Sequence, residues 1–393
     1  MSLRVSRNIS VDSVLVGTTM VLIGLGAVMI ASSSVGKADD DLGNPLYYLE
    51  QHLLALSLGL VGLTVALRVP IDWWNRLASV LLAVAFAVLV LVLLPGVSER
   101  INGAKRWLEI GPVSLQASEL ARVLILIYLA SYAVRQLNAL RSGFQGFARP
   151  MLIVGLAAIL LLQEPDFGAT VVLTASSLGI LFIAGARLRD VALTSVAAGG
   201  AFALLIWSSP YRWNRILNSF LDPWQDQYDT GYQLVNSFIA IGSGSWFGAG
   251  LGAGVQKLHY LPEPHTDFIF AVLAEELGFI GASGVIVLFG LLVWRAISLG
   301  QQAIRRGMLF HGLLAIGVGL TIGLEASISV GVNTGLLPTK GLTLPLISYG
   351  RSSLIAAMIA IEALRMHNSA RLTWYGTAIG SALIGLAWTA VLL

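Results

Sequence analysis

The sequence predicts an all-α polytopic membrane protein with ten transmembrane helices and a large extracytoplasmic loop before the eighth span. Of its 393 residues, 56% are hydrophobic and only 11% are charged, whereas soluble domains carry roughly 25% charged residues. Mean hydropathy is +0.81. Apolar runs of the roughly 20 residues that a bilayer-spanning helix needs recur along almost the whole chain.

Ten apolar runs meet this length rule. They make residues 1–371 one transmembrane domain, and residues 372–393 are a weaker candidate for an eleventh span. The first run is too long for a signal-peptide core and lacks a convincing small-residue cleavage site, so it is predicted to be retained. The runs lie near residues 12–33, 50–68, 76–95, 117–134, 149–164, 167–185, 190–208, 267–294, 308–331 and 348–366.

The basic residues orient these spans, because cytoplasmic loops carry an excess of Lys and Arg. With a cytoplasmic N-terminus, the inside loops hold 14 of the 24 basic residues. The others gather in a few outside segments together with most of the acids, which indicates that outside charge serves chemistry. The inside set is Arg4, Arg7, Arg68, Arg76, Arg135, Arg141, Arg149, Arg187, Arg189, Arg295, Arg305, Arg306, Arg365 and Arg371.

Composition also excludes some classes of function. A net charge of +3 and a pI near 9.2 would suggest nucleic-acid binding in a soluble protein. Here the basic residues mark membrane topology, so no nucleic-acid partner is expected. The chain has no cysteine, which excludes a disulfide framework and a thiolate metal site.

Two outside segments in the first third of the chain differ in character. Residues 34–49 are acidic and are expected to form a plain loop. Residues 96–116 place Lys105, Arg106 and Trp107 together. Trp prefers the membrane interface, and a neighbouring Lys–Arg pair can bind an anionic head group there. The alternative, equally open, is that these side chains only anchor the chain at the interface.

The fourth span opens with Glu119 and Arg122, three residues apart on one helix face and close enough to pair. An ion pair near a membrane surface more often lines a polar cavity than faces lipid. The next outside turn, QEPDFG, carries Glu164 and Asp166. The chain has a DFG triplet here but none of the other kinase motifs, so a kinase is excluded. The two acids either form the turn or belong to a site or to a set of cation ligands.

The longest outside segment, 209–266, mixes aromatic residues with charges and is expected to be an amphipathic region lying on the bilayer. Its glycines between residues 242 and 254 neither follow a strand nor spell the dinucleotide fingerprint. We expect them instead to allow close backbone packing.

The stretch from Leu261 to Gly278 is the most informative part of the chain. Pro262 and Pro264 predict a stiff, extended lead-in, Thr266 an N-cap, and Asp267 the first helical residue. Aspartate is common in a first helical turn because it suits the helix dipole. Glu275 and Glu276, deeper in the same span, point about 100° apart, so at least one must meet a polar partner.

The outside loop after the ninth span carries Lys340 among glycine and proline turns, and Ser348, Tyr349 and Arg351 open the tenth span. All the outside clusters fall at the membrane boundary rather than at the midplane, and no internal repeat typical of a transporter is detected. Cations beside one carboxylate suit a lipid-linked anionic substrate whose phosphates are held while the carboxylate does acid–base work.

Two segments of the chain resemble the SEDS proteins, which are ten-span peptidoglycan glycosyltransferases: VQKLHYLPEPHTDFIFAVLAEELG and GLLPTKGLTLPLISYG. Their sequences are closer to those of the division members than to those of the elongation members. The resemblance covers the chain from the first span to about Arg365. It implies that lipid II is the substrate, that Asp267 is the catalytic acid–base residue and that Lys340 meets pyrophosphate.

The resemblance also implies further site residues, partners and a location. A divalent cation, Mg²⁺ or Mn²⁺, is implied for some members, and its ligands here would be Asp267 with Glu164 or Asp166. Implied partners are lipid II, the undecaprenyl-pyrophosphate-linked glycan strand, a class B penicillin-binding protein (FtsI-like) and the division regulators FtsQ, FtsL and FtsB. The implied location is the bacterial inner membrane at the septum, with the site on the periplasmic face. The expected substrate-binding set is Lys105, Arg106, Glu119, Arg122, His265, Lys340, Ser348, Tyr349 and Arg351.

Several residues depart from the SEDS pattern and keep two alternatives open, a lipid II flippase and a non-catalytic scaffold for the penicillin-binding protein. Arg122 replaces a lysine, which changes hydrogen-bonding geometry, and Arg351 stands where glycine is usual. The other departures are Ala117, Glu325 and Ser329. The helix terminus would lower the pKa of Asp267, so we hypothesise that burial under residues 209–266 raises it towards neutrality.

Overall fold

The computed structural model describes residues 12–98, 104–110, 113–208, 213, 222–229, 231–258, 260–339 and 341–364. Lys340, the candidate eleventh span at 372–393 and most of residues 209–230 lie outside these ranges. The predictions made for those residues are therefore untested.

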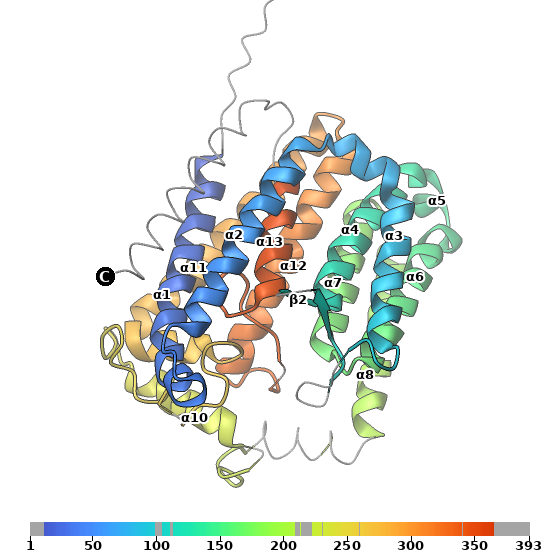
Figure 1. Ribbon diagram of the computed structural model, residues 1–393. Coiled ribbons are helices and arrows are strands. Elements are labelled where there is room, and N and C mark those ends of the chain that lie inside the picture. Colours follow the sequence, from blue (N-terminus) through green and yellow to red (C-terminus); the bar gives the residue numbers. More distant parts are fainter. Residues whose placement is uncertain are drawn as a thin grey trace, which may run out of the picture.

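The described chain is a bundle of helices that run side by side (Figure 1). In order they are α1 (Ser13–Leu42), α2 (Tyr47–Arg68), α3 (Ile71–Leu93), α4 (Ala117–Arg135), α5 (Leu137–Ser142), α6 (Phe144–Gln163), α7 (Phe167–Ile183), α8 (Leu188–Trp207), α10 (Tyr232–Ser243), α11 (Ile269–Arg305), α12 (Leu309–Asn333) and α13 (Arg351–Ile361), followed by the 3₁₀ turn η2 (Glu362–Leu364).

Each of the ten predicted spans coincides with one of these helices. Within the described residues, eight helices are long and apolar enough to cross a membrane, and α7 and α13 are shorter apolar helices. The chain is thus an all-helical, multi-pass membrane protein. Helices α4 and α12 lie at the centre of the bundle, with 78% and 67% of their apolar windows buried, whereas α8 is only 6% buried and lies at its edge.

The prediction of a plain loop at residues 34–49 is wrong, because α1 continues through Lys37 and the acidic residues to Leu42. The helix ends where Gly43 adopts a left-handed φ of 64° and donates its N–H to Asp39 O at 2.9 Å. A glycine in this conformation is a common helix terminator. The apolar pattern ends before the helix does because charged residues are compatible with a helix that leaves the bilayer.

The predicted continuous eighth span is also corrected. Helix α11 starts at Ile269, two residues after Asp267, and its N-cap is Phe268 without a side-chain cap. Thr266 instead donates its hydroxyl to Glu263, and the proline lead-in folds as turns rather than as extended chain. At Gly278 the backbone is non-helical, with φ 69° and ψ −171°, so α11 consists of a short arm, Ile269–Leu277, and a long arm that reaches Arg305.

The glycine-rich segment packs against this break, as its composition predicted. Residues on either side of Gly248 exchange backbone hydrogen bonds with the α11 chain: Ala249 N donates to Glu275 O at 2.9 Å and Phe279 N to Ser245 O at 2.8 Å. A Cβ on Gly248 would lie 2.1 Å from Glu276 O. Only glycine permits this approach, and the freed backbone groups at the break are satisfied by it.

One end of the bundle, which we call the site end, gathers the segments singled out in the sequence. It holds a two-stranded hairpin, β1 (Trp107–Ile110) and β2 (Val113–Gln116), with Leu108 opposite Leu115. Helix α10 lies at the same end, packed on α11, and α5 lies at the opposite end (Figure 1). The hairpin and α5 were not predicted, since four- to six-residue elements leave no clear periodic pattern.

Candidate active site

Asp267 lies at the site end in the turn that precedes α11, where its side chain is half-buried. Its main chain is held by Asn333, the last residue of α12, which is fully buried. Asn333 Nδ2 donates to Asp267 O at 3.0 Å, and Asn333 Oδ1 accepts from Ala271 N at 3.1 Å. A single amide therefore fixes both the turn and the first helical turn behind it.

The segment 341–350 folds over the same turn. Ser348 Oγ donates to Thr266 O at 2.7 Å, and Tyr349 N donates to His265 O at 2.8 Å. A Cβ on Gly341 would lie 3.2 Å from Asp267 Oδ2, so this glycine lets the loop backbone approach the carboxylate. The loop backbone at Gly341 and the turn that contains Asp267 are thus brought together, whereas Lys340 itself lies outside the described residues.

An aromatic cluster closes the side of the site. The rings of Tyr48 and His265 lie 4.3 Å apart, and Tyr349 completes the cluster, 5.2 Å from Tyr48 and 5.5 Å from His265. Burial lowers the pKa of His265 to about 4, so the ring is neutral at physiological pH. His265 consequently contributes packing and hydrogen-bonding capacity rather than positive charge.

Glu263 is the charged neighbour of Asp267 within the turn. Burial favours its neutral form, but the Lys37 ammonium, at 3.2 Å, outweighs this and holds the pKa of Glu263 below its usual value. Thr266 Oγ1 also donates to Glu263 at 3.1 Å. Glu263 is therefore an anion beside Asp267.

Burial, the Glu263 anion and Asp166 together raise the pKa of Asp267 to about 7 against the opposing effect of Arg106, and burial is the largest cause. This direction is the one hypothesised from the sequence. The helix terminus does not dominate, because α11 begins two residues later. A carboxylate with a pKa near the ambient pH is suited to accept and return a proton.

Arg106 brings the hairpin strand to the QEPDFG turn. Its Nε donates to Glu164 O at 3.0 Å, and its Nη2 donates to Pro165 O. The Glu164 side chain is fully buried, and burial raises its pKa to about 8, with Asp166 adding to the effect and Arg106 opposing it. Glu164 is thus a neutral acid at pH 7.

Both carboxylate oxygens of buried Asp166 accept hydrogen bonds from the protein. Its Oδ1 accepts from Ala169 N at 3.1 Å as the N-cap of α7, and its Oδ2 accepts from Ser118 Oγ at 3.0 Å and from Gln116 Nε2 at 3.2 Å. Within the described ranges, no group of three or more His, Asp and Glu side chains is arranged to hold a metal ion. The expected cation ligands, Asp267 with Glu164 or Asp166, are only two protein side chains, and they stay a prediction.

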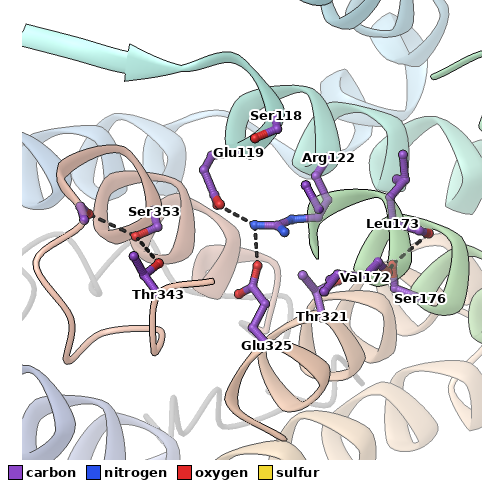
Figure 2. A network of polar contacts seen from close by, with 12 residues as sticks. Ser118, Glu119, Arg122, Val172, Leu173, Ser176, Thr321, Glu325, Thr343 and Ser353 are labelled. Carbon is purple, nitrogen blue, oxygen red and sulfur yellow. Dashed lines mark hydrogen bonds and ion pairs between the residues drawn. The ribbon is translucent and has the colours of Figure 1, made fainter. Parts of the chain in front are cut away.

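Glu119 and Arg122 pair as predicted, and Glu325 of α12 adds a second carboxylate to the same guanidinium (Figure 2). All three side chains are buried between α4 and α12. Arg122 Nε and Nη1 have no hydrogen-bond partner among the described atoms. Both carboxylates contact the same nitrogen, Arg122 Nη2, so the positive charge at residue 122 compensates the additional buried acid at Glu325.

Arg351 contacts two neighbouring elements at the start of α13. Its Nη1 donates to Gln51 Oε1 at 3.2 Å, and its Nη2 donates to Ser114 Oγ at 2.6 Å. Ser352 continues this link by donating to Ser114 O at 2.9 Å. Arg351 thus joins α2, β2 and α13, and Lys105 stands half-buried before β1. Their roles in substrate binding remain predictions.

Sequence reasoning missed Asn333, Lys37 and Gly341 as parts of this site. Asn333 and Gly341 flank the turn-rich loop around Lys340, and a buried amide at a helix end is a signal that could have been read. Lys37 was hidden in the segment taken for a plain loop.

The chain is similar to known proteins both in sequence and in fold. A family model described as "Cell cycle protein", covering FtsW, RodA and SpoVE, matches residues 13–371. The chain is 51% identical over 351 residues to a probable peptidoglycan glycosyltransferase FtsW of Thioalkalivibrio sulfidiphilus, covering 89% of this chain and 88% of that protein. It is 48% identical over 359 residues to the Hahella chejuensis protein of the same name, covering 91% and 90%.

Two solved structures share the fold at 28% identity. One, described as "Structural coordination of polymerization and crosslinking by a peptidoglycan synthase complex", superposes with a TM-score of 0.72 and covers 91% of this chain and 97% of that one. The other is the Thermus thermophilus rod shape determining protein RodA, with a TM-score of 0.66 and coverage of 91% and 96%. By these matches, the chain belongs to the cell cycle protein family of FtsW, RodA and SpoVE, the SEDS proteins.

Proposed function

We propose that this protein polymerises lipid II into glycan strands and that Asp267 is the general base. The acceptor sugar hydroxyl gives its proton to the Asp267 carboxylate while its oxygen bonds to the anomeric carbon of the growing strand. The bond from that carbon to the pyrophosphate breaks, and undecaprenyl pyrophosphate leaves with the electron pair. A base of this kind contributes typically about 10² to 10⁴-fold to a rate.

The observation that carries the proposal is the environment of Asp267. Its carboxylate is half-buried, its pKa is raised to about 7, and its backbone is fixed by Asn333. Few carboxylates combine a near-neutral pKa with residual exposure, and such groups are good candidates for acid–base catalysis.

We assign the leaving group to the cations of the site end. Arg106 stands close enough to Asp267 to lower its pKa, and Lys340 follows Thr339 in the loop whose Gly341 approaches the carboxylate. Arginine and lysine beside a departing pyrophosphate stabilise the charge that develops on it. The other proposed substrate-binding residues are Lys105, Glu119, Arg122, His265, Ser348, Tyr349 and Arg351.

We further propose the division branch, with ten spans, a cytoplasmic N-terminus and the site on the periplasmic face of the inner membrane at the septum. Relatives at 48% to 51% identity bear the FtsW name, and the ten predicted spans all coincide with helices. A class B penicillin-binding protein (FtsI-like) is the proposed transpeptidase partner, with FtsQ, FtsL and FtsB as regulators. The peptidoglycan synthase complex found among the similar structures supports a partnered enzyme.

A divalent cation, Mg²⁺ or Mn²⁺, stays a separate proposal. Its proposed protein ligands are Asp267 with Glu164 or Asp166, and the substrate pyrophosphate would supply the others. Full activity in excess EDTA would rule out this proposal.

The decisive experiment is lipid II polymerisation by the purified protein with its transpeptidase partner, comparing wild type with Asp267→Asn. We expect glycan strands from the wild type and a loss of at least about 100-fold in the variant, which keeps the shape but cannot take a proton. A variant that still polymerises would remove the acid–base role of Asp267.

The same preparations test the alternatives. A flippase would move labelled lipid II across liposome membranes regardless of Asp267, without forming strands. A scaffold would stimulate its transpeptidase equally well as wild type and as Asp267→Asn, again without strands.

A further inference from the structure

A cluster of buried charges lies behind the candidate active site, at the far end of the short arm of α11. Glu275 and Glu276 end this arm, and both side chains are buried. Glu275 Oε1 accepts from Val255 N at 2.8 Å and from Gln256 N at 3.2 Å. The carboxylate therefore binds the backbone of a segment 19 to 20 residues earlier in the chain.

Glu276 forms an ion pair with Lys257, the next residue of that segment. Lys257 Nζ lies 2.7 Å from Glu276 Oε1, and both side chains are buried. Ser32 Oγ of α1 donates to Glu276 Oε1 at 2.7 Å, and Lys257 Nζ also lies 2.9 Å from Gly252 O. Burying an ion pair is costly unless its remaining polar groups are hydrogen-bonded. Here Ser32 and Gly252 O provide those hydrogen bonds.

These contacts close the chain between Val255 and Glu276 into a ring. Asp267 lies on this ring, on the side away from the closing contacts, and the short arm of α11 forms its return path. Asn333 holds the ring from outside through Asp267 O and Ala271 N. The turn that carries the Asp267 carboxylate is thus held from outside the ring by Asn333, Ser348 and Tyr349, and within the ring by the closure.

We propose that Lys257 and Glu276 are positioning residues for Asp267, and that closing the ring through their ion pair sets the distance from the Asp267 carboxylate to the acceptor hydroxyl. This inference rests on the proposed function. Neither residue touches substrate in the proposal, so the pair acts on the rate of the chemical step rather than on lipid II binding.

The geometry favours positioning over simple stabilisation. A purely structural role could be met by apolar side chains of similar volume, which often replace a buried ion pair without loss of stability. A packing contact, however, would not define the register between residue 257 and residue 276 as the ion pair and the Glu275 hydrogen bonds do. Displacing a catalytic group by about 1 Å can cost about 100-fold in rate.

The test compares lipid II polymerisation by the full-length protein with its partner for three forms: wild type, the double variant Lys257→Met with Glu276→Gln, and the charge exchange Lys257→Glu with Glu276→Lys. The double variant leaves no unpaired buried charge, so its melting temperature should stay near that of the wild type. We expect its kcat to fall about 100-fold with KM nearly unchanged. The kcat of the charge-exchange variant should be at least about tenfold higher than that of the double variant.

The chain supplies a matched control. Asp12, the N-cap of α1, forms an ion pair with Arg295 in the long arm of α11, on the other side of the Gly278 break. The double variant Asp12→Asn with Arg295→Met should keep the wild-type kcat, because its pair does not belong to the ring.

A second variant keeps the test valid if the first does not fold. A Cβ on Gly254 would lie 3.0 Å from Glu275 Oε2 and 3.1 Å from Glu276 Oε1. Gly254→Ala therefore pushes both carboxylates by a few tenths of an ångström without removing a charge, and it should lower kcat but not lipid II binding.

The outcomes are distinguishable. If the wild type polymerises, Asp267→Asn does not, and either the double variant or a folded Gly254→Ala keeps the wild-type kcat, the positioning role is wrong and the proposed function stands. If the wild type forms no strands, or Asp267→Asn forms them, the proposed function itself fails.

Discussion

Asp267 is a carboxylate whose surroundings favour the neutral acid. Because its pKa is raised to about 7 by burial and by Glu263, the basic form predominates only above that pH and its fraction falls about tenfold for each pH unit below it. We expect kcat/KM to fall about tenfold for each pH unit below 7 and to level off above it. Measuring polymerisation between about pH 5 and 8.5 tests this, and a rate that is flat down to pH 5 would contradict it.

The same shift predicts a trade-off between activity and stability at this residue. The ordinary pKa of an aspartate carboxyl is 3.8, and the pKa of Asp267 in the folded protein is about 7. The favourable contribution of this group to folding is therefore complete below about pH 4 and is lost as the pH rises through 7. Asp267→Asn cannot ionise. It should be inactive yet more heat-stable than wild type, with a larger gain in melting temperature at pH 8 than at pH 5.

Asn333 shows how one amide can serve a site without touching substrate. Its side chain bonds to Asp267 O, Ala271 N and Ser329 O. Asn333→Leu would remove these bonds and leave Asp267 O without its amide donor, whereas Ala271 N would keep its bond to Phe268 O at 3.0 Å. A buried polar group left without a partner costs about 1 to 3 kcal/mol. We expect a lower melting temperature and a lower kcat, measured on the same detergent-solubilised protein. Unchanged values of both would show that water replaces the amide.

At the scale of the element, the break in α11 depends on one glycine. Gly278 has φ 69°, and a Cβ there would lie 2.3 Å from Gly248 N. Gly278→Ala should destabilise the protein by at least about 1 to 2 kcal/mol from the left-handed conformation alone. Gly284, in the long arm, has open space around its Cβ position, so Gly284→Ala is the matched control and should be neutral or stabilising. Equal melting temperatures for the two variants would contradict this account.

The elements also show what the sequence could predict. Each predicted span coincides with a helix of the described chain, and eight of these helices are long and apolar enough to cross a membrane, because a run of apolar residues is a direct consequence of crossing a bilayer. The pairing of Glu119 with Arg122 and the polar partners of Glu275 and Glu276 also followed, since buried charge must be compensated. The break at Gly278 was not predicted, because a glycine inside an apolar run looks the same whether it is helical or left-handed.

The site was predictable in part for the same reason. The approach of the Lys340 loop to Asp267 and the near-neutral pKa of Asp267 were expected from resemblance and from burial. Lys37 and Asn333 were missed, because their contributions arise from contacts between α1, α12 and the turn at 261–268, which are distant in the sequence. The sequence pattern within a short window does not reveal contacts between residues that are distant in the chain.

At the scale of the whole molecule, the absence of cysteine makes topology directly testable. Asp41 and Arg306 are exposed and lie at opposite ends of the bundle. If the site end is periplasmic, a membrane-impermeant maleimide should label Asp41→Cys in intact spheroplasts and should label Arg306→Cys only after lysis. The reverse pattern would invert the proposed orientation.

The left-handed residue in α11 has a mechanical consequence. A tilt of the long arm would be absorbed at Gly278 instead of swinging the short arm, Ile269–Leu277, that follows Asp267. Two unbroken helices reach the turn from the opposite end: α12, from Leu309 to the amide at Asn333, and α1, whose Lys37 pairs with Glu263. If the site end is periplasmic, a signal that originates in the cytoplasm would reach the Asp267 carboxylate by moving α12 or α1 rather than the long arm of α11.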